Sequence, residues 1–153
     1  MRNFLVKFIS TFFYVGYFPF ASGTFASIAG ICLFSLIGRS IYTQVAVATL
    51  LIILGLVTSG RAERVFGKKD PSCIVIDEVA GVFLSVLFLP YNLRSLVLAL
   101  LVFRLLDIIK PYPADRFQAK SGSIGIMGDD IVAGIYTNII LQAVFRLAVF
   151  NTS

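Results

Sequence analysis

The stretch Ser121-Gly-Ser-Ile-Gly-Ile-Met-Gly-Asp-Asp-Ile-Val-Ala-Gly-Ile135 runs from a glycine-rich segment through two adjacent acids into a long apolar run. A second adjacent pair, Asp77-Glu78, also stands at the start of an apolar run, and residues 77–81 and 130–134 share the pattern D-x-x-A-G. Because positions i and i+4 lie on the same face of a helix, each acid is expected one turn from a glycine. A glycine lets another backbone or a ligand approach closely. Two acid-headed, glycine-faced helices of this kind are what a shared metal or phosphate site would need.

Beyond this stretch, the composition is that of an integral membrane protein. Of the 153 residues, 58% are hydrophobic and 14% are charged, and the mean hydropathy is +0.93. Soluble domains carry about 25% charged residues, so this chain has too few charged side chains to cover a solvated surface. We therefore expect an all-α fold in a single domain over residues 1–153: a small polytopic membrane helical bundle with about five membrane helices plus an N-terminal interfacial helix.

Apolar runs bounded by turn residues indicate where the helices lie. Lys7, Ser10 and Thr11 interrupt the first run and Pro19 ends it, which favours an interfacial helix there. Membrane helices are expected at residues 24–38, 42–59, 74–89, 93–109 and 130–150, with polar loops at 60–73 and 114–128. Several runs of about 15–17 residues, at about 1.5 Å per residue, are short for a hydrocarbon core of about 30 Å.

The charged and reactive side chains exclude several classes of function. The net charge is +5, but the basic residues lie in short loops beside apolar runs, so we expect anionic lipid headgroups and no nucleic acid as partners. The chain has no histidine, which excludes histidine phosphatases, His-metal hydrolases and Ser-His-Asp triads. Cys32 and Cys73 have neither metal-ligand nor phosphatase-loop spacing and are interpreted as free, buried thiols.

Loop charge predicts that the polar residues share one side of the membrane. Cytoplasmic loops are enriched in Lys and Arg, and the loops at 60–73 and 110–128 are both basic. The hairpin of helices 74–89 and 93–109 returns the second loop to the side of the first, so the two assignments agree. We therefore expect a multi-pass protein whose active face is cytoplasmic.

Five acids are candidates for binding a cation: Asp77, Glu78, Asp107, Asp129 and Asp130. One acid at a helix start would be interpreted as an N-cap that favours the helix dipole, but adjacent like charges gain nothing from capping alone. Carboxylates without His or Cys partners suit a hard cation, and Mg²⁺ often binds substrate phosphate as well. The five acids are therefore predicted to hold Mg²⁺.

Basic residues and glycines beside the acids are candidates for binding phosphate. Arg104 and Lys110 flank Asp107 at i−3 and i+3, where they either form an ion pair with it or clamp a phosphate. The glycines of residues 121–128 would let a loop wrap an anion. Together with the acids, these residues describe Mg²⁺-assisted phosphoryl chemistry on a lipid headgroup.

A small, hydroxyl-rich segment, Ser22-Gly-Thr-Phe-Ala-Ser27, leads into the first expected membrane helix. Its hydroxyls either cap free N–H groups at the helix start or contact a phosphate there. The two interpretations stay open, and Gly23, Thr24 and Ser27 are kept as candidates for substrate binding.

Three motifs, in this order and spacing, resemble the phosphatidylglycerophosphatase A family. They are Ile76-Asp-Glu-x-x-Gly81, Phe103-Arg-x-x-Asp-x-x-Lys-Pro-x-Pro113 and Gly125-x-Met-x-Asp-Asp-x-x-Ala-Gly134, preceded by Gly23-Thr-x-x-Ser27. The resemblance covers about residues 16–145. It implies an all-helical, Mg²⁺-dependent phosphatase of the bacterial inner (cytoplasmic) membrane. Such an enzyme converts phosphatidylglycerophosphate to phosphatidylglycerol and inorganic phosphate in bacterial phospholipid synthesis.

The resemblance also implies roles for individual residues. The five acids would be the metal-binding and catalytic carboxylates. Arg104 and Lys110 would contact the phosphate, and the Gly23 element would belong to the same substrate site. Attack by water and an aspartyl-phosphate intermediate both remain open.

Two other functions fit parts of the pattern. A CDP-alcohol phosphatidyltransferase also uses acids and Mg²⁺ at a membrane, but its D-G-x2-A-R-x8-G-x3-D-x3-D run is absent here. A small ion-coupled transporter would agree with the repeated D-x-x-A-G pattern, but its charges are expected near the bilayer midplane rather than at helix ends. The phosphatase therefore has the better support from the sequence.

Overall fold

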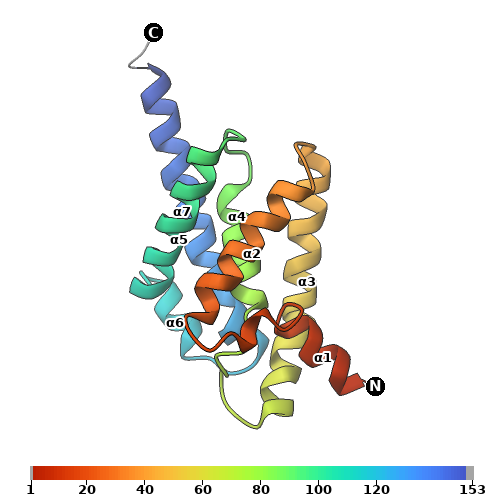
Figure 1. Cartoon of the computed structure of the whole chain (residues 1–153). Helices are drawn as coiled ribbons and strands as arrows, with labels where there is room; N and C mark the ends of the chain where they lie inside the picture. The colour runs from red at the N-terminus through yellow and green to blue at the C-terminus, as the bar shows by residue number, and fades with distance from the viewer. Residues whose placement is uncertain (1, 151–153) are drawn as a thin grey trace.

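The computed structural model describes residues 2–150, and within that range the chain forms helices and no strand (Figure 1). The elements are α1 (Arg2–Ser10), the 3₁₀ helix η1 (Val15–Tyr17), α2 (Ser22–Leu36), α3 (Ile41–Phe66), α4 (Ile76–Val86), α5 (Leu93–Ile109), α6 (Ala114–Gln118) and α7 (Ser123–Phe150). The predicted all-α class is confirmed.

Helix α4 lies at the centre of the bundle, with α2, α3, α5 and α7 packed around it (Figure 1). It has 11 residues, and all but Glu78 and Leu84 are buried. Phe83 is fully buried and packs edge-on against Phe34 of α2, with 5.3 Å between the ring centroids. A helix that is apolar all round is stable only as the core of such a bundle. Its position explains why acids at its first turn are drawn into the protein interior.

Among the described residues, two helices are long and apolar enough to cross a membrane: α3, and α7 between Ser123 and Leu147. Helix α2 is apolar but has 15 residues, which at about 1.5 Å per residue is about 22 Å, less than a hydrocarbon core of about 30 Å. Helix α4 is shorter still, with 11 residues. The bundle therefore has two candidate spans by length and composition, and a count of about five membrane helices remains a prediction.

Two predicted loops are partly helical. Helix α3 continues through residues 60–66, which were expected in a polar loop, and ends where Gly67 adopts φ +66°. The segment 121–128 was expected to be a glycine-rich loop around an anion, but α7 already begins at Ser123. A Cβ on Gly125 would collide with the carbonyl oxygen of Lys120, and one on Gly128 with the ring of Phe117. These glycines allow α6 to pack closely on α7, so the predicted anion-wrapping loop is wrong.

The ends of several elements meet at one pole of the bundle, low in the view of Figure 1. There α2, α4 and α7 begin, α3 and α5 end, and α6 follows α5. Helix α1 packs against α3 beside this pole. The backbone amide of Val75 donates a hydrogen bond to the carbonyl of Ser10, and this bond joins the N-terminal segment to the loop before α4. Residues from five distant parts of the sequence thus surround one region.

Candidate active site

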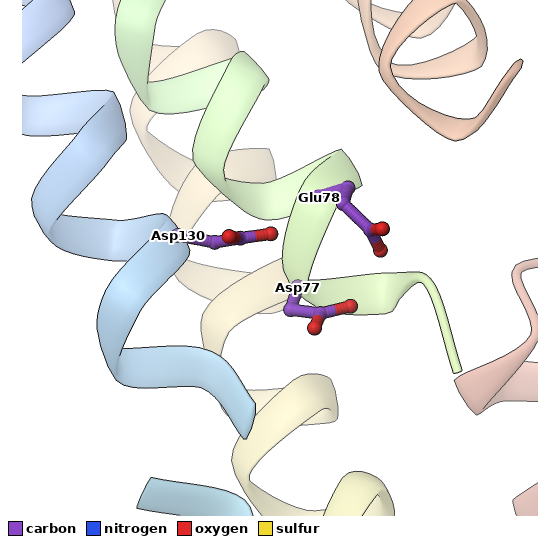
Figure 2. Close-up of side chains that lie close together, drawn as sticks. All are labelled: Asp77, Glu78 and Asp130. Atoms are coloured by element: carbon purple, nitrogen blue, oxygen red, sulfur yellow. The ribbon is translucent and has the colours of Figure 1, made fainter. Parts of the chain in front are cut away.

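The crossing of α4 and α7 brings the two acidic segments together. A Cβ on Gly134 of α7 would collide with the carbonyl oxygen of Gly81 of α4, so the two backbones are in direct contact where these glycines lie. One turn before them, carboxylate oxygens of Asp77, Glu78 and Asp130 lie within 4.8 Å of one another (Figure 2). The repeated D-x-x-A-G pattern therefore lies at the crossing of α4 and α7.

Each of the three carboxylates has one buried oxygen without a partner in the described part of the chain. Asp77 is 7% exposed and Asp130 3% exposed, while Glu78 is half-buried. Asp77 Oδ1, Glu78 Oε2 and Asp130 Oδ2 are buried with no hydrogen-bond partner among the described residues. Two unit charges about 5 Å apart repel by roughly 3 kcal/mol at an effective dielectric constant of about 20. When all three carboxylates are ionised, this repulsion favours a cation among them; without one, protonation relieves it.

Burial and the neighbouring negative charges raise the pKa values of Asp77 and Glu78. Burial, followed by the charge of Glu78, raises the pKa of the Asp77 carboxyl well above its usual range. Burial, followed by the charge of Asp130, raises the pKa of Glu78 to about 8. Without a cation, these two groups therefore take up protons at a pH where exposed carboxyls are ionised.

Two ion pairs border the acidic cluster. Arg104 Nη1 lies 2.6 Å from Asp107 Oδ2 within the last turns of α5. Lys110, at the end of α5, pairs with Asp129 Oδ2 of α7 rather than with Asp107. Lys110 adopts φ +50° and ends the helix just before Pro111, and this sharp turn directs the chain away from α5. Of the two cations flanking Asp107 in the sequence, one forms the intrahelical pair and the other bridges to a different helix.

The acids and cations line one pocket of about 500 Å³ at the pole of the bundle. Eight of the ten residues that the sequence singled out contribute to its wall: Gly23, Asp77, Glu78, Arg104, Asp107, Lys110, Asp129 and Asp130. The other two, Thr24 and Ser27, do not line it. Ser27 is fully buried, and its hydroxyl donates to the carbonyl of Gly23 at 2.8 Å. A substrate contact by Thr24 or Ser27 stays a prediction.

Gly23 has a steric reason to be glycine. A Cβ at this position would collide with Glu78 Oε1 and would lie 3.0 Å from Arg104 Nη1. The first turn of α2 is therefore in direct contact with one acid and one cation of the pocket.

The sequence did not single out the loop between α3 and α4, which contributes Asp70, Ser72 and Ile74 to the pocket wall. Ser22 of α2 also lines the pocket and donates its hydroxyl to the carbonyl of Ser72 at 2.9 Å. Asp70 directly precedes a proline, a pattern typical of an ordinary turn, so its local sequence gives no functional signal.

Glu63 at the end of α3 holds this loop in place. Its Oε1 accepts a hydrogen bond from the backbone amide of Asp70 at 3.2 Å, and its Oε2 accepts one from the amide of Gly122 at 3.0 Å. One side chain thus joins the loop before α4 to the residue that precedes α7. Because both segments lead into the acidic cluster, Glu63 couples the two walls of the pocket.

The donor set fits a hard divalent cation. All candidate ligand atoms are carboxylate oxygens, and among the described residues one oxygen each of Asp77, Glu78, Asp129 and Asp130 is buried without a partner. Mg²⁺ prefers carboxylate oxygen and water, and it leaves positions for substrate phosphate. Asp77, Glu78 and Asp130 are therefore the residues that could hold such an ion, beside Arg104 and Lys110, which could hold an anion.

Comparisons with known proteins agree with this chemistry. Residues 8–145 match the family described as phosphatidylglycerophosphatase A. A "Putative phosphatidylinositol-3-phosphatase" of Bacteroides thetaiotaomicron is 34% identical over 148 residues, 91% of this chain and 92% of the relative. A "Phosphatidylglycerophosphatase A" of Haemophilus influenzae is 34% identical over 130 residues, 81% of this chain and 78% of the relative. One of the same name from Escherichia coli is 34% identical over 125 residues, 78% of this chain and 72% of the relative.

No solved structure matches the chain significantly. The assignment therefore rests on the sequence comparisons and on the pocket. The family match covers nearly all of the chain and includes each acid and cation of the site. The chain belongs to the phosphatidylglycerophosphatase A family and is an enzyme of the phosphatase class.

Proposed function

We propose that the protein hydrolyses the terminal phosphate of phosphatidylglycerophosphate in a Mg²⁺-dependent reaction that yields phosphatidylglycerol and inorganic phosphate, as a step of bacterial phospholipid synthesis. The observation that carries the proposal is the close approach of Asp77, Glu78 and Asp130, whose oxygens lie within 4.8 Å in a pocket that also holds Arg104 and Lys110. A phosphate monoester needs both a cation and positive side chains to offset its charge.

In this proposal the carboxylates divide into two groups. Asp77, Glu78 and Asp130 would hold the cation, since each has a buried oxygen that lacks a partner among the described residues. When bound, Mg²⁺ polarises the phosphate and neutralises charge that develops in the transition state. Asp107 and Asp129 complete the catalytic carboxylate set and hold Arg104 and Lys110 at the edge of the cluster.

The cations bind the phosphate. Arg104 can donate two parallel hydrogen bonds to phosphate oxygens, whereas Lys110 acts as a point charge. Gly23 lets α2 approach both Glu78 and Arg104 closely. Attack by water forms the new P–O bond in line with the bond that breaks, and the lipid hydroxyl leaves with a proton.

Membrane placement follows from the same geometry. Helices α3 and α7 are the two candidate spans, and the polar pocket lies at the pole where α3 ends and α7 begins. With the basic loops on the cytoplasmic side, this pole faces the cytoplasm, and the protein is a multi-pass component of the bacterial inner membrane. A headgroup could then enter the pocket from the interface while its acyl chains stay in the bilayer.

A second lipid substrate has support from one relative. The Bacteroides thetaiotaomicron relative, which aligns over most of both chains, is named for phosphatidylinositol 3-phosphate. That lipid and phosphatidylglycerophosphate both carry a phosphate monoester on a polyol headgroup, and the acidic cluster would treat the two phosphates alike. Preference for one of the two lipids then depends on contacts with the polyol, which Ser22, Asp70 and Ser72 of the pocket wall could supply.

The experiment is a substrate panel with purified protein in mixed micelles containing Mg²⁺. Phosphate release is measured from phosphatidylglycerophosphate, phosphatidylinositol 3-phosphate and phosphatidate at equal surface concentration. The highest kcat/KM for phosphatidylglycerophosphate supports the proposal. A higher value for phosphatidylinositol 3-phosphate would assign the second function, and no release from any of the three would contradict both.

A further inference from the structure

A second hollow, of about 560 Å³, lies between α2 and α5. Its wall is made by Ile31, Cys32 and Leu36 of α2 with Leu93, Val97 and Leu100 of α5. The hydroxyl of Ser35, which also lines it, donates to the carbonyl of Ile31 at 2.9 Å and so presents no free polar group. We call this hollow the α2–α5 groove. Its chemistry fits a hydrocarbon chain.

The groove and the acidic pocket are built on the same two helices. In the acidic pocket, Gly23 of α2 approaches Arg104 of α5. In the groove, Ile31 and Leu100 both pack against the buried cluster of Val82, Phe103 and Ala133. Leu100 is four residues from Arg104, or about 6 Å along α5. Ile31 is eight residues from Gly23, or about 12 Å along α2. The groove therefore begins about one helical turn from Arg104 along α5 and about two turns from Gly23 along α2.

The distance from Arg104 to the far end of the groove is close to the thickness of one leaflet of a bilayer. Helices α2 and α5 run in opposite directions, so the far end of the groove lies near Leu36 and Leu93 (Figure 1). From Arg104 to Leu93 the distance along α5 is about 16 Å, and half of a hydrocarbon core of about 30 Å is about 15 Å. A lipid whose phosphate lies beside Arg104 would thus have its tail along this groove.

We propose that the α2–α5 groove is a binding site for one acyl chain of the lipid substrate, held there while the headgroup phosphate occupies the acidic pocket. This inference rests on the proposed lipid phosphatase function and adds the site that positions the hydrophobic part of the substrate. Lipid tails are as apolar as the groove wall, so moving an acyl chain from the bilayer into the groove gains no hydrophobic free energy. The groove favours the substrate chain through the fit between its shape and that chain. A bulky side chain in the groove should therefore exclude the acyl chain.

The first test compares Val97→Trp with the matched control Leu101→Trp. Val97 lines the groove, whereas Leu101 is exposed on the same helix and does not line it. With a long-chain substrate, Val97→Trp should lower kcat/KM at least about fivefold, the low end of what overpacking costs. With a dibutanoyl substrate, whose tails are too short to fill the groove, both variants should match the wild type. Equal effects of the two variants on the long-chain substrate would overturn the proposal.

The second test uses a thiol already present in the groove. Cys32 is free but exposed, whereas the sequence predicted a buried thiol, so its alkylation rate reports whether the groove is covered. In phosphatidylcholine nanodiscs with chelator, long-chain phosphatidylglycerophosphate should slow alkylation of Cys32, and the dibutanoyl analogue should not. Equal protection by added phosphatidylcholine would assign the groove to bulk lipid and overturn the proposal. A change in oligomeric state caused by Val97→Trp, without a change in chain preference, would assign it to a second copy of the chain.

The two tests separate this inference from the proposed function. If the wild type released no phosphate from any lipid, the proposed function would fail, while Cys32 protection would still report whether the groove binds a chain. If phosphate were released with no dependence on chain length in any variant, the function would stand and the acyl-chain site would be refuted.

Discussion

Gly134 of α7 lies against the backbone carbonyl of Gly81 of α4, so closely that a Cβ on Gly134 would collide with that oxygen. This contact sets the distance between the two helices, and with it the distance between the acids one turn away. A Cβ on Gly81 would in turn collide with the backbone oxygen of Asp130 and the ring of Phe103. The acidic cluster therefore depends on two positions that carry no chemistry of their own.

Replacing either glycine of this crossing should destabilise the protein. In a helix without close neighbours, Gly→Ala stabilises by about 1 kcal/mol because alanine has the higher helix propensity. Gly81→Ala and Gly134→Ala should instead lower the free energy of unfolding by about 1–3 kcal/mol, since a methyl group must be inserted between packed backbones. Thermal or denaturant unfolding in detergent measures the difference. Stabilisation by either substitution would show that the helices are not in contact there.

Neutralising one acid of the cluster should uncouple stability from Mg²⁺. In the wild type, Mg²⁺ should raise the Tm by binding the folded state and offsetting the repulsion among Asp77, Glu78 and Asp130. Asp130→Asn removes one charge, so its Tm in chelator should be at least that of the wild type, with little further rise when Mg²⁺ is added. Asp115→Asn on the exposed face of α6 is the control and should respond to Mg²⁺ as the wild type does. An unchanged Mg²⁺ response in Asp130→Asn would remove this residue from the metal site.

The raised pKa of Glu78 predicts how stability changes with pH in the absence of metal. Its pKa is about 8 in the folded protein and 4.5 in the ordinary reference state, so the folded state binds more protons between these values. The stabilisation from the protonated carboxyl is present below about pH 4.5 and is lost as the pH rises through about 8. In chelator, the Tm of the wild type should therefore fall more steeply between pH 5 and 9 than that of Glu78→Gln. Parallel curves for the two proteins would contradict the raised pKa.

Glu63 should affect substrate binding without touching substrate. Glu63→Ala removes acceptors for the backbone amides of Asp70 and Gly122, a loss of about 1 kcal/mol of stability per hydrogen bond. We expect a KM several-fold higher, a smaller change in kcat, and faster hydrogen exchange at these two amides. Arg64→Ala, on the exposed surface of the same turn, is the control. Unchanged exchange at both amides would show that Glu63 does not hold the two segments.

The elements with strong local signals were predicted well from the sequence. Helix α5 begins and ends at the expected residues, 93 and 109. Asn92 caps its start by accepting a hydrogen bond from the amide of Ser95 at 2.9 Å, and Pro111 prevents its continuation. The shared D-x-x-A-G pattern likewise identified the acids that the structure brings together, because its spacing is a property of the helix itself.

What the sequence did not reveal depends on contacts between distant segments. Residues 123–128 are rich in glycine and were expected to form a loop, but their packing against Phe117 and Lys120 outweighs their low helix propensity. The pairing of Lys110 with Asp129 joins α5 to α7, which no local spacing indicates. Asp70 joins the pocket only because Glu63 holds its loop, an interaction between residues seven positions apart across a helix end.

The proposed reaction is tested most directly by the initial rate of phosphate release from phosphatidylglycerophosphate by the purified protein. The rate is measured with Mg²⁺ and with chelator, for the wild type and for the variants Asp77→Ala, Asp107→Ala and Asp130→Ala. We predict release that falls at least about 100-fold in chelator, since a bound cation supplies several kcal/mol of transition-state stabilisation. The three variants should be inactive while still inserting into membranes. Equal rates with Mg²⁺ and with chelator, or activity like that of the wild type in all three variants, would contradict the proposed Mg²⁺-dependent reaction at these acids.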